Sequence, residues 1–153
     1  MLKLDRLFRD YVAPMFRRPK RLQVAALCHR TGKRGKEVLL VTSRGTGRWI
    51  IPKGWPIRGL ASSEAAMQEA WEEAGVKGDT PQDQAIGTYS YDKWSNSGLP
   101  VPVEALVYSV EVDSLAQDFP EAHQRRRRWA TPAEAATLVD EPELKSIFRN
   151  IDS

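Results

Sequence analysis

Apolar residues recur at two spacings along this chain, and each spacing predicts a different kind of element. Short apolar runs bounded by polar or turn-forming residues are typical of β-strands. Four such runs stand out, together with a shorter apolar segment at 49–52: residues 22–28, 37–43, 84–91 and 101–112. The turn-like residues 31–36 between the first two runs predict that these strands form a hairpin.

Residues 62–74 give the strongest helix prediction, because they are mostly good helix formers. Ser62 or Ser63 is expected to cap the start, where Glu64 sits near the positive end of the helix dipole. Gly75 stands in the position that commonly ends a helix. The segment is therefore predicted to be a helix of about three and a half turns.

Two helices are predicted near the C-terminus and one near the N-terminus. Thr131 and Glu134 form a capping box with Pro132 in the first turn, and a last helix is expected over residues 142–148. Apolar residues at positions 4, 7, 8, 11, 12 and 15 predict a short amphipathic helix. We therefore expect one domain over residues 1–153, with residues 1–20 as a helical extension. Its strands mixed with a few helices indicate an α/β or α+β layered fold.

Composition and charge narrow the classes of protein. With 41% hydrophobic and 28% charged residues in 153, the chain is typical of a globular domain. No apolar run approaches the roughly 20 residues of a membrane helix, and charges interrupt residues 1–16 where a secretory signal would be apolar. A single cysteine, Cys28, excludes an intramolecular disulfide framework and is expected to be a small buried side chain. We expect a cytoplasmic protein without membrane contact.

The charges are unevenly distributed. Residues 1–58 hold 15 Lys and Arg against 3 Asp and Glu, a balance of +12, whereas residues 59–153 hold 8 against 17, a balance of −9. Such asymmetry is compatible with nucleic acid, with a phosphorylated small molecule, or with solvation alone. The charge distribution alone does not distinguish among these three interpretations.

Three glutamates on the predicted helix carry the strongest chemical signal. Glu69, Glu72 and Glu73 share one helix face, where like charges raise one another's pKa. A hard divalent cation such as Mg²⁺ would relieve this repulsion, and it commonly works with substrate phosphates. A Lys53-Gly54 turn upstream would let a main-chain carbonyl face the same cation. The alternative for the helix taken alone is a solvated acidic face.

The spacing around these glutamates resembles the signature of the Nudix hydrolases. That signature is a glycine, five residues, a glutamate, seven residues, and then Arg-Glu-apolar-x-Glu-Glu-x-Gly-apolar. The positions that match are Gly54, Glu69, Ala70, Glu72, Glu73, Gly75 and Val76. Residues 37–43, residues 48–53 and the late Arg127-Arg128-Trp129 resemble the diphosphoinositol polyphosphate and dinucleoside polyphosphate hydrolase branch.

Two signature positions differ. Leu60 stands where the family has its first glutamate, and Gln68 stands where it has arginine. In the family these two residues typically pair and orient the helix. Losing both partners of such a pair can be nearly neutral, so the joint change indicates a substituted structural pair. Gln68 is expected to orient a glutamate by hydrogen bonding, and Glu64 is a candidate for part of the missing role.

The resemblance implies a Nudix-like α/β/α sandwich with a central mixed sheet and a fixed set of site roles. It implies Mg²⁺, with Mn²⁺ as an alternative, held by Glu69, Glu73 and the Gly54 carbonyl. Glu72 is implied as a further ligand or as the general base. The implied reaction is hydrolysis of a phosphoanhydride bond.

Basic residues are candidates for contacts with substrate phosphates, because guanidinium and ammonium groups match phosphate oxygens. Lys53 has the strongest case because it adjoins Gly54. The other candidates are Arg17, Arg18, Lys20 and Arg21 before the first strand, Arg44 and Arg48 before the motif, and Arg127 or Arg128 by resemblance. For any single one, ordinary surface charge is the alternative. Trp55 and Trp94, in loop-like surroundings, are candidates for stacking on a base.

Three functional hypotheses remain open at this point. The leading one is a Mg²⁺-dependent diphosphate hydrolase acting on a dinucleoside polyphosphate or an inositol pyrophosphate, as a monomer or homodimer. A second is a pyrophosphohydrolase of nucleoside triphosphates or RNA 5′ ends, although nucleic acid is not the favoured partner. A third is a ligand- or RNA-binding module of the same fold without catalysis.

Overall fold

The computed structural model describes residues 19–94, 96 and 98–151. The expected helix around residues 4–15 lies outside this part of the chain. None of the helices in the described part is both long enough and apolar enough to cross a bilayer.

A mixed sheet forms the centre of the fold, with β1 (Arg21–Gly32) in its middle. β1 pairs antiparallel with β2 (Gly35–Thr42) and parallel with β7 (Val101–Glu111), and β6 (Gly87–Lys93) pairs antiparallel with β7. Three short strands extend this sheet: β3 (Trp49–Ile50) and β9 (Arg127–Ala130) on β2, and β4 (Lys53–Gly54) on β1. A separate pair joins β5 (Val76–Lys77) to β8 (Ser114–Leu115).

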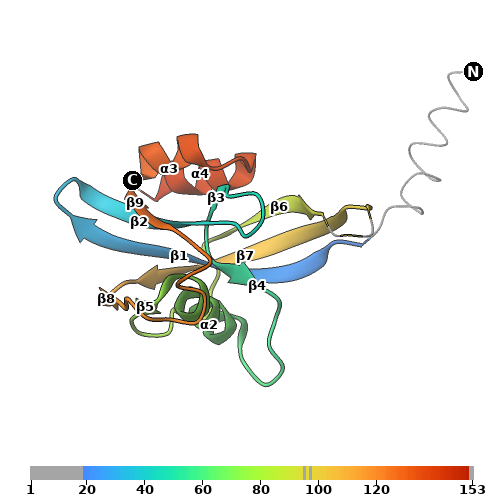
Figure 1. The fold of residues 1–153 in the computed structure, drawn as a ribbon, viewed down its shortest axis with the longest axis horizontal. Coiled ribbons are helices and arrows are strands. Elements are labelled where there is room, and N and C mark those ends of the chain that lie inside the picture. The colour runs from blue at the N-terminus through green and yellow to red at the C-terminus, as the bar shows by residue number, and fades with distance from the viewer. Residues whose placement is uncertain (1–18, 95, 97, 152–153) are drawn as a thin grey trace, which may run out of the picture.

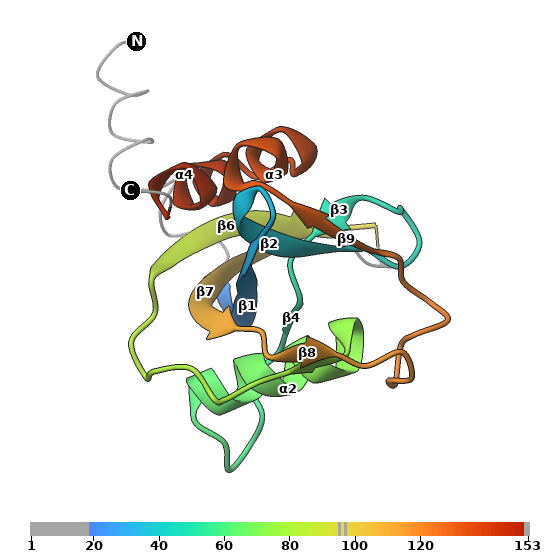
Figure 2. The ribbon, with the colours of Figure 1, turned by 90° about the vertical axis from the view of Figure 1, so that its left-hand side faces the viewer.

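Helices cover both faces of the sheet. Figures 1 and 2 show α2 (Ser62–Ala74) on one face and α3 (Pro132–Leu138) with α4 (Pro142–Asn150) on the other. The alternation along β1 explains this layering, because successive strand side chains point to opposite faces. Ala26 and Cys28 belong to the core under α2, whereas Ala25 and Leu27 belong to the core under α3 and α4. The expected α/β/α sandwich with a mixed central sheet is confirmed.

Most element predictions hold, with shifts at their ends. α2 has the expected bounds, and Thr131 caps α3 by accepting a hydrogen bond from the Glu134 backbone N–H. The β1–β2 ladder continues to the Gly32–Gly35 pair, so the turn is two residues rather than six. β6 begins at Gly87, three residues later than expected, because its pairing with β7 fixes its range. Cys28 is fully buried, as expected, and burial raises its pKa to about 12.

Two local expectations were wrong. The Lys53-Gly54 segment is a short strand rather than a turn, because it pairs with Ala25 and Val24 of β1. The cap of α2 is Ala61 rather than a serine, because the Ser63 hydroxyl donates instead to Asp83 at 2.9 Å. Both differences arise from partners that are distant in sequence.

Candidate active site

A cleft of about 990 Å³ contains the signature glutamates. Its walls come from both ends of the chain, because α2, β4 and β6 meet the β2–β3 loop, the loop before β9 and the start of α4. Among its lining residues, seven are acidic (Glu69, Glu72, Glu73, Asp92, Glu121, Asp140, Glu141) and five are basic (Arg44, Arg48, Lys53, Lys93, Arg125). Without added cations the cleft is therefore net negative.

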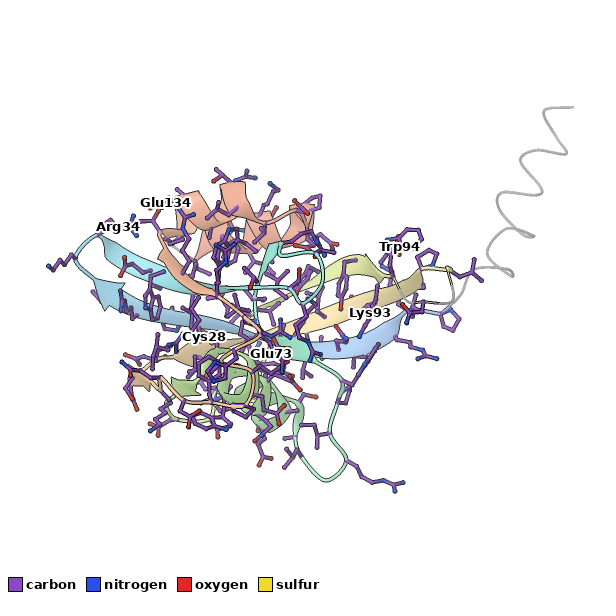
Figure 3. All side chains as sticks on the ribbon, in the orientation of Figure 1. Cys28, Arg34, Glu73, Lys93, Trp94 and Glu134 are labelled. Carbon is purple, nitrogen blue, oxygen red and sulfur yellow. The ribbon has the colours of Figure 1, made fainter. Side chains whose placement is uncertain are left out.

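The packing of α2 determines which of its side chains face this cleft. The helix places a row of alanines against the sheet, namely Ala65, Ala66, Ala70 and Ala74, all of them buried. Small side chains let the helix lie close to the sheet, so the neighbouring glutamates are partly enclosed. Figure 3 shows Glu73 beside β4, near the centre of the molecule.

Glu73 is the most buried of the three glutamates, with a side chain 8% exposed. Its Oε2 accepts a hydrogen bond from the Lys53 backbone N–H at 3.1 Å, and its Oε1 pairs with Arg125 Nη2 at 3.2 Å. Burial raises the pKa of Glu73 to about 7, although Arg125 and the Lys53 N–H act in the opposite direction. The desolvation of this carboxylate is therefore only partly offset by its partners.

Glu69 lies over the backbone of Gly54. A Cβ atom built on Gly54 would overlap the Glu69 carboxylate, so only glycine leaves room for that group. Burial, followed by the charges of Glu73 and Glu72, raises the pKa of Glu69 to about 7. This contact gives the glycine of the signature a steric reason.

Of the two altered signature positions, Gln68 contacts a signature glutamate, whereas Leu60 lies in the loop before the helix. Gln68 Nε2 donates a hydrogen bond to Glu72 Oε1 at 2.9 Å, one helical turn away, as expected of a residue that orients a glutamate. Glu64 accepts from the Ala61 backbone N–H at 3.0 Å at the helix start rather than contacting Gln68. Leu60 is 40% exposed in the loop before α2.

The predicted basic residues divide into two groups. Arg44, Arg48 and Lys53 line the cleft, as Trp55 and Trp94 also do. Lys20 lies outside the lining set and donates to the Ser90 hydroxyl at 2.9 Å, while Arg21 is exposed at the start of β1. Arg128 pairs with Glu134 at 3.7 Å instead of lining the cleft, and Arg127 donates to the carbonyls of Ala74 and Ala116. Arg17 and Arg18 lie outside the described residues.

Lys53 and Arg48 already have anionic neighbours. Burial lowers the pKa of Lys53 to about 8, whereas the charges of Glu73 and Glu141 raise it. The Lys53 ammonium lies 4.9 Å from the centre of the Tyr91 ring. Arg48 Nη1 is 3.0 Å from Asp140 Oδ2 and 3.5 Å from Glu141 Oε1, so its charge is largely neutralised.

Arg125 and Glu121 lie on the cleft next to the signature helix, and the sequence pattern did not single out either residue. Arg125 is 5% exposed, and its Nη2 lies 3.2 Å from Glu73 and 3.3 Å from Glu121. Strand-like alternation puts Arg125 and Arg127 on the side opposite Arg126 and Arg128, a signal that could have separated them. Nothing comparable marks Glu121, a single acidic residue in a loop.

The donor set has the chemistry of a hard divalent cation site. Carboxylates that are desolvated and repel one another are stabilised by such an ion, which prefers oxygen ligands. Within the described residues, no three Asp, Glu, His or Cys side chains are gathered so as to hold a metal ion. In this structure Arg125 provides the positive charge beside Glu73.

Comparisons with known proteins establish the family. The fold and the site define an α/β/α domain with a carboxylate-lined cleft, and residues 20–151 of this domain match the NUDIX domain. The chain therefore belongs to the Nudix family.

The proteins similar in sequence to this chain include a plant Nudix hydrolase and a human diphosphoinositol polyphosphate phosphohydrolase. The chain is 34% identical over 108 residues to Nudix hydrolase 12, mitochondrial, of Arabidopsis thaliana, covering 67% of this chain and 51% of that protein. It is 28% identical over 119 residues to human diphosphoinositol polyphosphate phosphohydrolase 3-beta, covering 76% and 68%. The chain thus spans about half the length of the first of these relatives.

Solved structures share the fold at low sequence identity. The C. elegans Ap4A hydrolase superposes with a TM-score of 0.60 at 19% identity, covering 88% of this chain and 97% of that one. The NUDIX domain of Shewanella oneidensis NrtR, complexed with ADP ribose, gives a TM-score of 0.64 at 16% identity, covering 97% and 98%. These likenesses concern the fold alone.

Proposed function

We propose that this protein is a Mg²⁺-dependent pyrophosphohydrolase that cleaves a phosphoanhydride bond in a phosphorylated small molecule. The observation that carries the proposal is the cleft itself, whose lining includes Glu69, Glu72, Glu73 and Gly54 together with the cationic side chains of Arg44, Lys53 and Arg125. Glu69, Glu73 and the Gly54 carbonyl would hold Mg²⁺, and Mn²⁺ has the same oxygen preference. When bound, the cation neutralises phosphate oxygens and the leaving group.

The net negative charge of the cleft supports cation dependence. Seven acidic lining residues against five basic ones would repel a polyphosphate, so added positive charge is needed before such a substrate binds. Lys53 and Arg44, which both line the cleft, would then contact phosphate oxygens. The oxygen of a water molecule attacks phosphorus, and a cleft glutamate takes the proton of that water. The bridging P–O bond breaks, and its electron pair stays on the oxygen of the leaving phosphate. Glu72, oriented by Gln68, is our candidate for that base.

The distribution of charge favours a nucleoside polyphosphate, such as a dinucleoside polyphosphate, over an inositol pyrophosphate. Arg48 is already paired with Asp140 and Glu141, so the wall of the cleft around Arg48 offers little free positive charge to the many phosphate groups of an inositol pyrophosphate. Trp94 on the cleft lining is 69% exposed, whereas Trp55 is 38% exposed and has the Lys93 ammonium 4.9 Å from the centre of its ring. Exposed aromatic faces suit a base better than an inositol ring. Inositol pyrophosphates are still included in the test, because one relative is named as a diphosphoinositol polyphosphate phosphohydrolase.

The test is chromatographic analysis of the products formed with Mg²⁺ from a panel of nucleotides, dinucleoside polyphosphates, RNA 5′ ends and inositol pyrophosphates, because cleavage of a dinucleoside polyphosphate gives two nucleotides rather than free phosphate. We expect turnover of a dinucleoside polyphosphate, lost on Glu73→Gln and on addition of a chelator. Binding without hydrolysis across the panel would favour the non-catalytic module, and equal turnover by Glu73→Gln would remove Glu73 from the site. A single domain over residues 1–153, a cytoplasmic location and a monomeric or homodimeric state remain predictions.

A further inference from the structure

Two arginines from distant parts of the chain meet at one carboxylate, that of Glu121. Arg44 comes from the β2–β3 loop, and Arg125 precedes β9. Glu121 Oε1 lies 3.1 Å from Arg44 Nη1 and 3.3 Å from Arg125 Nη2. All three residues line the cleft, and Arg125 also touches Glu73 at 3.2 Å.

Glu121 is itself held in place from several directions. Its backbone N–H donates to the Glu72 carbonyl at 3.0 Å, which ties its loop to the signature helix. Gln124 donates its backbone N–H to the Glu121 carbonyl at 3.0 Å and accepts from Arg44 Nη1 through its side chain at 3.0 Å. The Glu121 side chain is 16% exposed, so it is largely shielded from water. Its position therefore depends on α2 and its own loop rather than on the arginines.

Arg44 needs such an anchor more than Arg125 does. The Arg44 side chain is 60% exposed, whereas that of Arg125 is 5% exposed and also donates to the Thr42 carbonyl at 3.0 Å. A long exposed side chain loses rotamer freedom when it is fixed, and two neighbouring guanidinium groups repel each other. A shared carboxylate offsets both effects.

We propose that Glu121 is a positioning residue that holds Arg44 and Arg125 side by side as a two-guanidinium clamp for a substrate phosphate. The proposal rests on the proposed function, because it names the phosphate group as the ligand of the clamp. Paired guanidinium groups bind phosphate oxygens through parallel hydrogen bonds, and a clamp arranged in advance avoids the entropy loss of ordering it on binding. Glu121 acts through the arginines and does not exchange protons with the substrate.

The experiment measures binding of imidodiphosphate, whose P–N–P bridge resists hydrolysis, by calorimetry with Mg²⁺ present. We expect Glu121→Ala and Arg44→Ala each to weaken binding about tenfold, and the double variant to be little weaker than either single one. Glu121→Gln, which keeps an acceptor oxygen but loses the charge, should weaken binding about threefold. Glu37→Gln is the matched control and should bind like the wild type, because Glu37 also bridges two arginines, Arg30 and Arg34, at the far end of the hairpin.

Three results would overturn the inference. The first is additive losses in the double variant, which would show that Glu121 does not act through Arg44. The second is a fall in kcat with unchanged KM and unchanged imidodiphosphate affinity, which would make Glu121 a catalytic base. The third is unaltered binding by Glu121→Gln, which decides the case if Glu121→Ala does not fold. A wild type that binds imidodiphosphate but hydrolyses nothing would refute the proposed function while leaving the clamp intact.

Discussion

Replacing Glu73 with glutamine should stabilise the metal-free protein at neutral and alkaline pH while it abolishes hydrolysis. The side chain is 8% exposed, and burial raises its pKa from 4.5 to about 7. Since one pKa unit corresponds to about 1.4 kcal/mol, holding Glu73 ionised in the folded state costs roughly 3 kcal/mol. Glutamine keeps an acceptor for the Lys53 N–H and removes the charge.

The raised pKa of Glu73 also predicts how the stability difference between the wild type and the variant changes with pH. Between about pH 4.5 and 7 the folded wild type binds more protons at Glu73 than the unfolded chain, so its stability falls as pH rises through this range. The variant lacks that contribution. The two proteins should therefore be similarly stable near pH 4.5, and the variant should gain about 1–3 kcal/mol over the wild type by pH 8.

Urea unfolding at pH 4.5, 6 and 8, with and without Mg²⁺, is the assay. Mg²⁺ should stabilise the wild type by about 2.7 kcal/mol at a hundred times its dissociation constant, and should stabilise the variant much less. One effect opposes the stability gain expected for Glu73→Gln. The substitution also breaks the buried ion pair between Glu73 and Arg125, and breaking such a pair commonly costs about 3–5 kcal/mol. A variant that is less stable than the wild type at pH 8 by such an amount would show that this pair outweighs burial, and would refute the reasoning.

Three further substitutions test the site and the core. Gly54→Ala places a methyl group in the space of the Glu69 carboxylate; kcat/KM should fall roughly 100-fold with a small change in Tm, and near-normal kinetics would contradict the steric account. Gln68→Arg should raise turnover severalfold, because a guanidinium replaces the neutral donor to Glu72; unchanged turnover or a loss of fold would count against it. Phe148→Ala should lower the free energy of unfolding by about 3–5 kcal/mol in urea, because Phe148 is a fully buried core residue of α4; a loss below about 1 kcal/mol would place it outside the core.

The sequence predicted those parts of the fold that depend on local pattern. α2 carries its helix formers and its terminal Gly75 within one segment, so its bounds followed directly. The strand predicted over residues 22–28 also followed from its continuous apolar run, although β1 continues to Gly32. The Lys53–Gly54 strand did not, since only pairing with β1 makes those two residues extended. The cap at Ala61 was missed for a similar reason, because Asp83 takes the hydroxyl of Ser63.

The site divides in the same way. Glu69, Glu72, Glu73 and Gly54 belong to one gapped motif whose spacing can be read from the sequence, and the structure places all four on one cleft. Arg125 and Glu121 follow the helix by about fifty residues, and only the tertiary fold brings them to it. Strand-like alternation separates Arg125 and Arg127 from Arg126 and Arg128, but it does not indicate which arginine is buried against a glutamate. Charge alone could not distinguish that residue from Arg128, which faces Glu134.

One helix connects the stability of this fold with its chemistry. The alanines of α2 set how closely the helix approaches the sheet, and that closeness removes water from Glu69 and Glu73 and raises their pKa to about 7. A looser helix would leave the glutamates solvated and less destabilising, but also less attractive to a cation. Larger side chains on the alanine face, as in Ala70→Leu, should therefore lower the folded stability through overpacking and weaken Mg²⁺ binding as well. In the proposed function, the destabilising burial of these carboxylates is thus the same property that prepares the cleft for a metal ion.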